Sequence, residues 1–130
     1  MKQTHGIRCV GYARSAVGPV DGQVDAIRKH CSSLFDVLRE PGRSARDLNR
    51  PQLKRLLRMV RRGRVDAVVV ARLTDLARSA EDFADLLVEF ERHDVRLISV
   101  SEGIDAASAD AICSLARTLR ATDGRKARTA

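Results

Sequence analysis

The stretch Tyr12-Ala13-Arg14-Ser15-Ala16 ends the first apolar segment of the chain, where a predicted strand gives way to polar side chains. Residues 7–13 are apolar on both faces, as in a buried strand of a parallel sheet. Gly18-Pro19 then indicates a turn that ends the strand before a helical pattern begins. Open α/β sheets place their chemistry on polar side chains that follow a strand and precede a helix. We therefore expect a functional site at this strand end.

Beyond this site, helical and strand patterns alternate along the chain. Apolar spacing predicts helices at about 20–32, from Pro51 to Gly63, after Ser79, and at about 108–121. Apolar or β-branched runs predict further strands at 34–38, 65–71 and 95–100. The order predicts an α/β fold, with a mostly parallel sheet of four to five strands and helices on both faces.

The connecting segments carry turn and capping signals. Residues 40–49 are expected to form a basic surface loop ending at Asn49, the expected N-cap of the second helix, and 101–105 a further loop. Ser79 and Asp82 are spaced as a capping box. Residues 1–121 are expected to form one domain and 122–130 a basic, disordered tail.

Composition narrows the class of protein. Of 130 residues, 44% are hydrophobic and 32% charged, as in ordinary globular domains, and no run approaches the roughly 18 apolar residues of a membrane span. A cytoplasmic location is expected.

The cysteines and histidines show no metal-binding pattern. Widely spaced Cys9, Cys31 and Cys113 are expected to be buried free thiols. The histidines share no ligand spacing with them, so no metal site is expected.

Positive charge is concentrated in one segment. The net charge is +7, and residues 43–64 carry nine basic side chains against one acid. Such a segment suits a polyanion, and arginine's planar fork suits phosphate. The scarcity of aromatic residues argues against single-strand nucleic-acid binding by base stacking. The candidate phosphate contacts are Arg43, Arg46, Arg55 and Arg58.

Five ordered motifs resemble the N-terminal catalytic domain of the serine recombinases, the resolvase/invertase family, over about residues 6–120. They are Gly11-Tyr12-Ala13-Arg14, Gln23-Val24-Asp25-Ala26-Ile27, Arg50-Pro51-x-Leu53-x-x-Leu56-Leu57, the segment 65–79, and Ser101-Glu102-Gly103-Ile104-Asp105. The resemblance implies a serine that attacks a DNA phosphodiester, giving a 5′-phosphoserine and a free 3′-hydroxyl. It implies no metal or nucleotide cofactor, because arginines stabilise the phosphoryl charge. Arg14, Arg50 and Arg78 match the family's arginines.

Three departures from the family pattern stand out. Ala16 occupies the position of the nucleophilic serine, and Ser15 next to it should face the other side of an extended chain. Thr74-Asp75 replaces Asp-Arg, so a carboxylate, expected to be solvated or arginine-paired, stands where an arginine is expected. The family's C-terminal DNA-binding domain has no counterpart in these residues, so any DNA contact is expected to be independent of sequence.

These observations favour a degenerate recombinase-like domain that lacks strand cleavage and acts by association. It would associate with duplex DNA, with its own copy as a homodimer, or with an active recombinase. One alternative is an active recombinase that uses Ser15 as its nucleophile. Another is an unrelated α/β module that binds a nucleotide or serves in signalling, although the chain has no glycine-rich phosphate loop.

Overall fold

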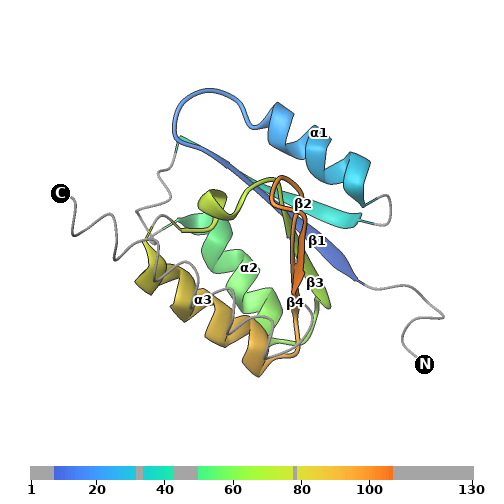
Figure 1. Ribbon diagram of the computed structural model, residues 1–130, viewed down its shortest axis with the longest axis vertical. Coiled ribbons are helices and arrows are strands. Elements are labelled where there is room, and N and C mark those ends of the chain that lie inside the picture. Colours follow the sequence, from blue (N-terminus) through green and yellow to red (C-terminus); the bar gives the residue numbers. More distant parts are fainter. Residues whose placement is uncertain (1–7, 32–33, 43–49, 78, 107–130) are drawn as a thin grey trace.

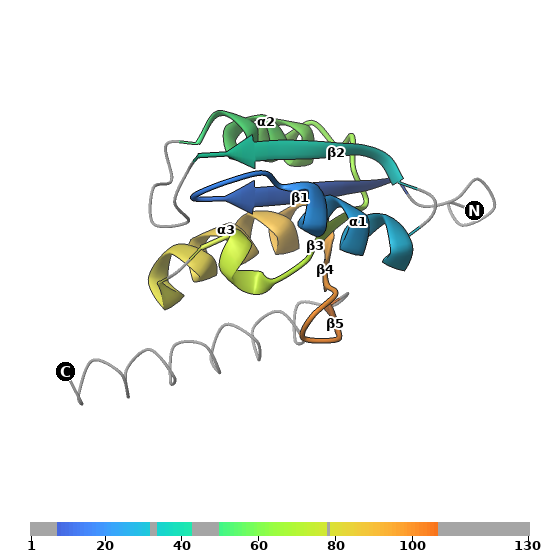
Figure 2. The ribbon, with the colours of Figure 1, turned by 90° about the horizontal axis from the view of Figure 1, so that it is seen from above.

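The computed structural model describes residues 8–31, 34–42, 50–77 and 79–106. Within these residues the chain forms one five-stranded sheet in the order β2-β1-β3-β4-β5 (Figures 1 and 2). The strands are β1 (Cys9–Ser15), β2 (Leu34–Pro41), β3 (Ala67–Val70), β4 (Arg96–Ser99) and β5 (Ile104–Ala106). β1 to β4 pair in parallel and β5 is antiparallel to β4. The predicted mostly parallel α/β sheet is confirmed.

Helices cover both faces of this sheet, also as predicted. α1 (Asp21–His30) lies on one face, and α2 (Pro51–Arg61) and α3 (Ala80–Arg92) lie on the other (Figure 1). A single 3-10 turn, η2 (Leu73–Asp75), follows β3. The predicted helix at 108–121 and the predicted tail at 122–130 lie outside the described residues. No helix in the described part of the chain is long and apolar enough to cross a membrane.

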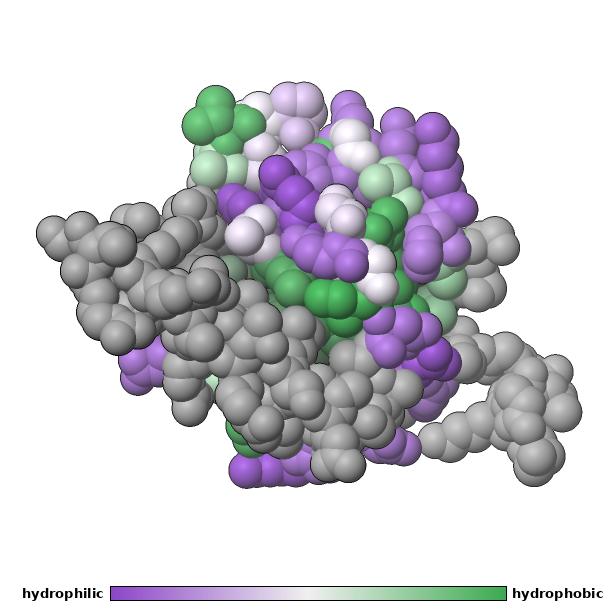
Figure 3. Space-filling model, in the orientation of Figure 1, coloured by the Kyte–Doolittle hydropathy of each residue, from purple (hydrophilic) through white to green (hydrophobic). Residues whose placement is uncertain are grey.

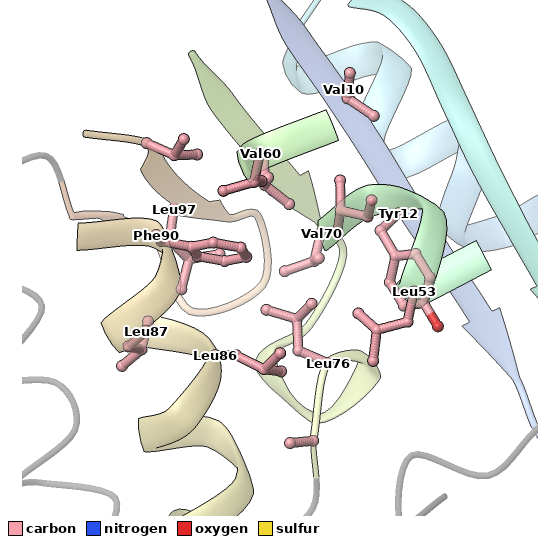
Figure 4. Close-up of a cluster of buried hydrophobic side chains, with 14 of the residues drawn as sticks. Val10, Tyr12, Leu53, Val60, Val70, Leu76, Leu86, Leu87, Phe90 and Leu97 are labelled. Carbon is pink, nitrogen blue, oxygen red and sulfur yellow. The ribbon is translucent and has the colours of Figure 1, made fainter. Parts of the chain in front are cut away.

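Side-chain alternation along β1 divides the core into two layers. Val10 and Tyr12 pack into the larger cluster, which α2 and α3 complete with residues such as Leu53 and Phe90 (Figure 4). On the other face, Cys9 and Ala13 pack with Val20, Val24 and Ile27 from the α1 region. The side chains of β1 therefore point alternately to the two faces of the sheet. Arg14 lies on the same face as Tyr12, the face covered by α2 and α3.

Gly11 lets α1 lie close to β1. A Cβ atom at this position would stand 2.9 Å from the Ile27 Cγ2 atom and 3.2 Å from Val37 Cγ2. Both neighbours pack into the α1-side cluster, so they have little room to move away. The other side of α1 carries exposed polar residues, including Asp21, Asp25 and Arg28, and Figure 3 shows a hydrophilic surface over this helix.

Three local predictions are wrong. Residues 101–105 are not wholly a loop, because Ile104–Ala106 turns back and pairs with β4 as β5. The predicted loop at 40–49 begins too early, because β2 pairs with β1 as far as Pro41. Pro41 has no N–H to donate, but it is tolerated at the end of an edge strand. The N-cap of α2 is Arg50 rather than Asn49, which itself lies outside the described residues.

Other local predictions hold. The Ser79 side chain accepts a hydrogen bond from the Asp82 N–H at 3.1 Å, so the capping box at the start of α3 is confirmed. The strand predicted at 65–71 contains β3, all four residues of which are buried. Cys9 is a buried free thiol as predicted, whereas Cys31 is only half-buried and Cys113 lies outside the described residues.

Candidate functional site

The candidate site lies where β1 and β3 end, at the carboxyl edge of the sheet. Asp75, in η2 just after β3, has no exposed surface. Its Oδ1 atom lies 3.3 Å from the Nη2 atom of Arg14 at the end of β1. The same oxygen lies 3.3 Å from the Nη2 atom of Arg72, a half-exposed residue. One buried carboxylate therefore serves as counter-ion to two guanidinium groups.

This carboxylate is poorly solvated. The Asp75 Oδ2 atom is buried and has no hydrogen-bond partner among the described residues. Burial raises the pKa of the Asp75 carboxyl above its ordinary value, and the charges of Arg72 and Arg14 oppose that shift. Because the contacts to both arginines are long for charge-assisted hydrogen bonds, desolvation has the larger effect. Asp75 is therefore an arginine-paired residue in a dry site.

Arg50 is turned into the protein and has no exposed surface. Its Nη1 atom donates to the Tyr12 hydroxyl at 3.1 Å and to the Asp75 carbonyl at 2.9 Å, and its Nη2 atom donates to the Leu76 carbonyl. Its guanidinium carbon also lies 5.7 Å from the centre of the Tyr12 ring, a cation–π distance. Burial lowers the pKa of Arg50. Arg50 thus joins the start of α2 to η2 and β1.

Glu40, predicted to lie in a loop, accepts hydrogen bonds from the free N–H groups at the start of α2. Its carboxylate is buried at the end of β2 and accepts from the Gln52 N–H at 3.0 Å and the Leu53 N–H at 2.9 Å. It also accepts from the Tyr12 hydroxyl at 3.2 Å. Burial raises the pKa of Tyr12, so this hydroxyl keeps its proton and remains a donor. No local sequence signal could have paired Glu40 with a helix that begins 11 residues later.

Replacing Glu40 with glutamine should destabilise the domain by about 1–2 kcal/mol, because a neutral amide interacts more weakly with the α2 N-terminus. Chemical denaturation measures this loss. The matched control is Glu91→Gln, an exposed residue on α3, which should change stability by less than about 0.5 kcal/mol. Equal effects of the two substitutions would show that the Glu40 charge does not stabilise α2.

The serine beside the expected nucleophile position is engaged locally. The Ser15 hydroxyl donates to the Val17 carbonyl oxygen at 2.6 Å and is half-buried, while Ala16 is exposed. Ser15 follows Ala13 in the alternation of β1, on the α1 side of the sheet, whereas Arg14 follows Tyr12 on the opposite side. Gln23 holds this strand end by donating to the Arg14 carbonyl at 3.3 Å.

The structure therefore brings together part of the predicted site. Arg14 and Arg50 both contact Asp75, the first through its carboxylate and the second through its carbonyl. Arg55 and Arg58 lie apart from them, exposed on α2. Arg43, Arg46 and Arg78 lie outside the described residues. In the part of the chain that the structure describes, no group of three or more His, Cys, Asp or Glu residues could hold a metal ion.

Comparison with known proteins places this geometry in a family. The family model "Resolvase, N terminal domain" matches residues 9–123. The chain is 34% identical over 101 residues to the DNA-invertase hin of Salmonella typhimurium, which covers 77% of this chain and 51% of that protein. It is 33% identical over 110 residues to the probable DNA-invertase y4cG of Sinorhizobium fredii, covering 83% of this chain and 34% of that protein. The chain thus spans about half the length of the first of these relatives and a third of the second.

Solved structures show the same fold. The N-terminal catalytic domain of TP901-1 integrase matches with a TM-score of 0.79 and 25% identity, covering 94% of this chain and 98% of that chain. A resolvase family site-specific recombinase from Streptococcus pneumoniae matches with a TM-score of 0.74 at 20% identity, over 95% of this chain and 91% of that chain. The sheet and the helices on its two faces are those of a resolvase-type N-terminal domain. The chain belongs to the serine recombinase family.

Proposed function

We propose that this domain is a degenerate serine recombinase domain that associates with duplex DNA without cutting it. The observation that carries the proposal is the buried Asp75 carboxylate on the Arg14 guanidinium. A guanidinium that stabilises a phosphoryl transition state must be available to its oxygens. Here the same group faces a carboxylate of this chain, at the position where the family resemblance predicts a further arginine.

The residues at and beside the family's nucleophile position support the same proposal. Ala16 stands at the serine position of the family pattern and has no nucleophilic atom. Ser15 donates its proton to the Val17 carbonyl and follows a residue that packs toward α1. To attack a phosphate beside Arg14, its oxygen would have to leave this hydrogen bond and reverse direction.

Trapping of covalent protein–DNA adducts tests the loss of cleavage. Supercoiled plasmid and labelled duplexes of mixed sequence are incubated with the protein, quenched in detergent and resolved by electrophoresis. We expect neither nicked plasmid nor detergent-stable adducts, because the Ser15 hydroxyl is not positioned for attack and Ala16 has none. The matched variant is Ser15→Ala. Adducts that form with the unmodified protein and disappear in Ser15→Ala would instead establish an active recombinase with Ser15 as its nucleophile.

The proposed DNA contact is the outer face of α2. Lys54, Arg55 and Arg58 are exposed there, and the helix contains no acidic residue. α3, beside it, is acidic on its outer face, with Glu81, Asp85 and Glu91 exposed. Duplex phosphates are therefore attracted to α2 and repelled by α3. Such a contact reads charge and not base sequence, which fits sequence-independent association.

Replacing both Arg55 and Arg58 with alanine should weaken duplex binding and flatten its salt dependence. Each lost phosphate contact should reduce the slope of log K against log salt by about 0.9. Fluorescence anisotropy of a labelled duplex over a salt series measures both effects. The control is Arg28→Ala, which removes an exposed arginine from α1 on the opposite face of the sheet. A slope unchanged by the double substitution would contradict contact through α2.

A second recombinase subunit completes the proposal. This second subunit would be either another copy of this chain or an active member of the family. The two subunits would associate in the cytoplasm. The proposal is supported by membership of a family that acts in site-specific recombination. Light scattering of the purified protein, alone and mixed with duplex DNA, should give a protein mass above that of one chain once the mass of the duplex is subtracted. A single-chain mass in both conditions would contradict self-association.

A further inference from the structure

Two cysteines far apart in the sequence meet at the amino edge of the sheet. Cys9 is the first residue of β1, and Cys31 directly follows the last residue of α1. Because α1 connects the parallel strands β1 and β2, it runs back along the sheet, and its end lies near the start of β1 (Figure 2). Cys31 packs against the same apolar cluster that contains Cys9.

The two thiols belong to one packed region but differ in exposure. Cys31 lies near enough to Cys9 to affect the Cys9 thiol, and neither of these two cysteines forms a disulfide among the described residues. Cys9 is only 5% exposed, whereas Cys31 is half-buried and within reach of small solutes. Burial first, and the Cys31 contact second, raise the pKa of the Cys9 thiol to about 11. Cys9 is therefore protonated at neutral pH, and Cys31 is the more accessible thiol.

We propose that Cys9 and Cys31 form a peroxide-sensitive dithiol that closes into an intramolecular disulfide. The inference is independent of the proposed DNA association. Because the two side chains pack in one apolar cluster at the same edge of the sheet, we expect side-chain rotation to bring the sulfurs to bonding distance. In a reducing compartment such a bond is transient and responds to oxidant instead of serving as a permanent brace.

The chemistry proceeds in two balanced steps. The Cys31 thiolate attacks a peroxide oxygen; an S–O bond forms, the O–O bond breaks and water leaves after protonation, giving a sulfenic acid. The Cys9 sulfur then attacks the Cys31 sulfur; the S–S bond forms, the S–O bond breaks, and the departing hydroxide takes the Cys9 proton as water. In total, two thiols and one hydrogen peroxide give one disulfide and two waters.

The disulfide would fix the end of α1 to the start of β1. The loop it closes contains the rest of β1, including Arg14 and Ser15, and all of α1. Closing a loop of this length restricts the unfolded chain, and we expect the melting temperature to rise by about 5–15 °C. Reduction with dithiothreitol should reverse this rise.

Peroxide treatment followed by thiol counting and peptide mass mapping tests the proposal. The chain has three cysteines, so the free thiols of the unmodified protein should fall from three to one, with a mass loss of two hydrogen atoms. Cys113→Ser should keep the crosslink. Cys9→Ala and Cys31→Ser should each lose the crosslink. If Cys9→Ala does not fold, Cys31→Ser still tests whether the crosslink needs both cysteines.

Three results would overturn the proposal. The first is a disulfide that includes Cys113. The second is oxidation of Cys31 without a crosslink to Cys9. The third is a Cys9–Cys31 disulfide that leaves the melting temperature unchanged, since such a bond would not fix α1 to the sheet.

Discussion

Replacing Arg50 with methionine should cost about 3–5 kcal/mol of unfolding free energy, a large part of the stability of a domain of this size. Methionine fills a similar volume but donates no hydrogen bond. The Tyr12 hydroxyl and the carbonyls of Asp75 and Leu76 would each lose a buried donor. The Glu40 carboxylate would also lose the attraction of a nearby positive charge. Urea denaturation followed by circular dichroism measures the loss.

One effect opposes this loss. Burial disfavours the charged guanidinium, as the lowered pKa of Arg50 indicates, and methionine escapes that cost. We expect the unpaired acceptors to outweigh it, because removing one partner of a buried polar network leaves the others without hydrogen bonds. The control is Arg55→Met, on the exposed side of the same helix, with an expected change below about 0.5 kcal/mol. A loss below about 1 kcal/mol for Arg50→Met would contradict a structural role for Arg50.

Much of the fold could be predicted from local patterns. The run Val65–Ala71 contains β3 because consecutive β-branched residues suit a strand that is buried on both faces. The stripe of Leu53, Leu56 and Val60 defined the buried side of α2. β5 could not be found in the same way, since its three residues form a strand only by pairing with β4.

The candidate site was less accessible to sequence reasoning, because its contacts join distant segments. The Arg14–Asp75 contact links residues 61 positions apart, although a paired Asp75 was one of the two expected states. The burial of Arg50 was not expected, because an arginine that follows a basic segment suggests exposure to phosphate. Glu40 was missed because its charge, next to Pro41-Gly42, has the appearance of a loop residue.

Replacing Asp75 with asparagine should increase affinity for duplex DNA by about tenfold. The substitution keeps the side-chain shape and removes the negative charge beside Arg14 and Arg72. A charge pair at about 4 Å contributes roughly 1 kcal/mol in water and about 4 kcal/mol near a protein surface. Arg14 is buried and Arg72 half-exposed, so an intermediate gain is expected, and about 1.4 kcal/mol corresponds to tenfold.

Two comparisons separate this effect from a general change in charge. Asp25→Asn removes the same charge from an exposed position on α1 and should change the affinity less than twofold. In a background that combines Arg14→Gln with Arg72→Gln, the gain from Asp75→Asn should disappear, because no guanidinium remains to be released. Circular dichroism of each variant establishes that the fold is retained.

The affinity of a labelled duplex for the unmodified protein and for Asp75→Asn, measured side by side at low salt, tests most directly whether the Asp75 carboxylate keeps Arg14 and Arg72 from DNA phosphates. Tighter binding by Asp75→Asn, with the gain lost in the double-glutamine background, is the predicted result. Equal or weaker binding by Asp75→Asn, with the fold intact, would show that Asp75 does not keep Arg14 and Arg72 from DNA.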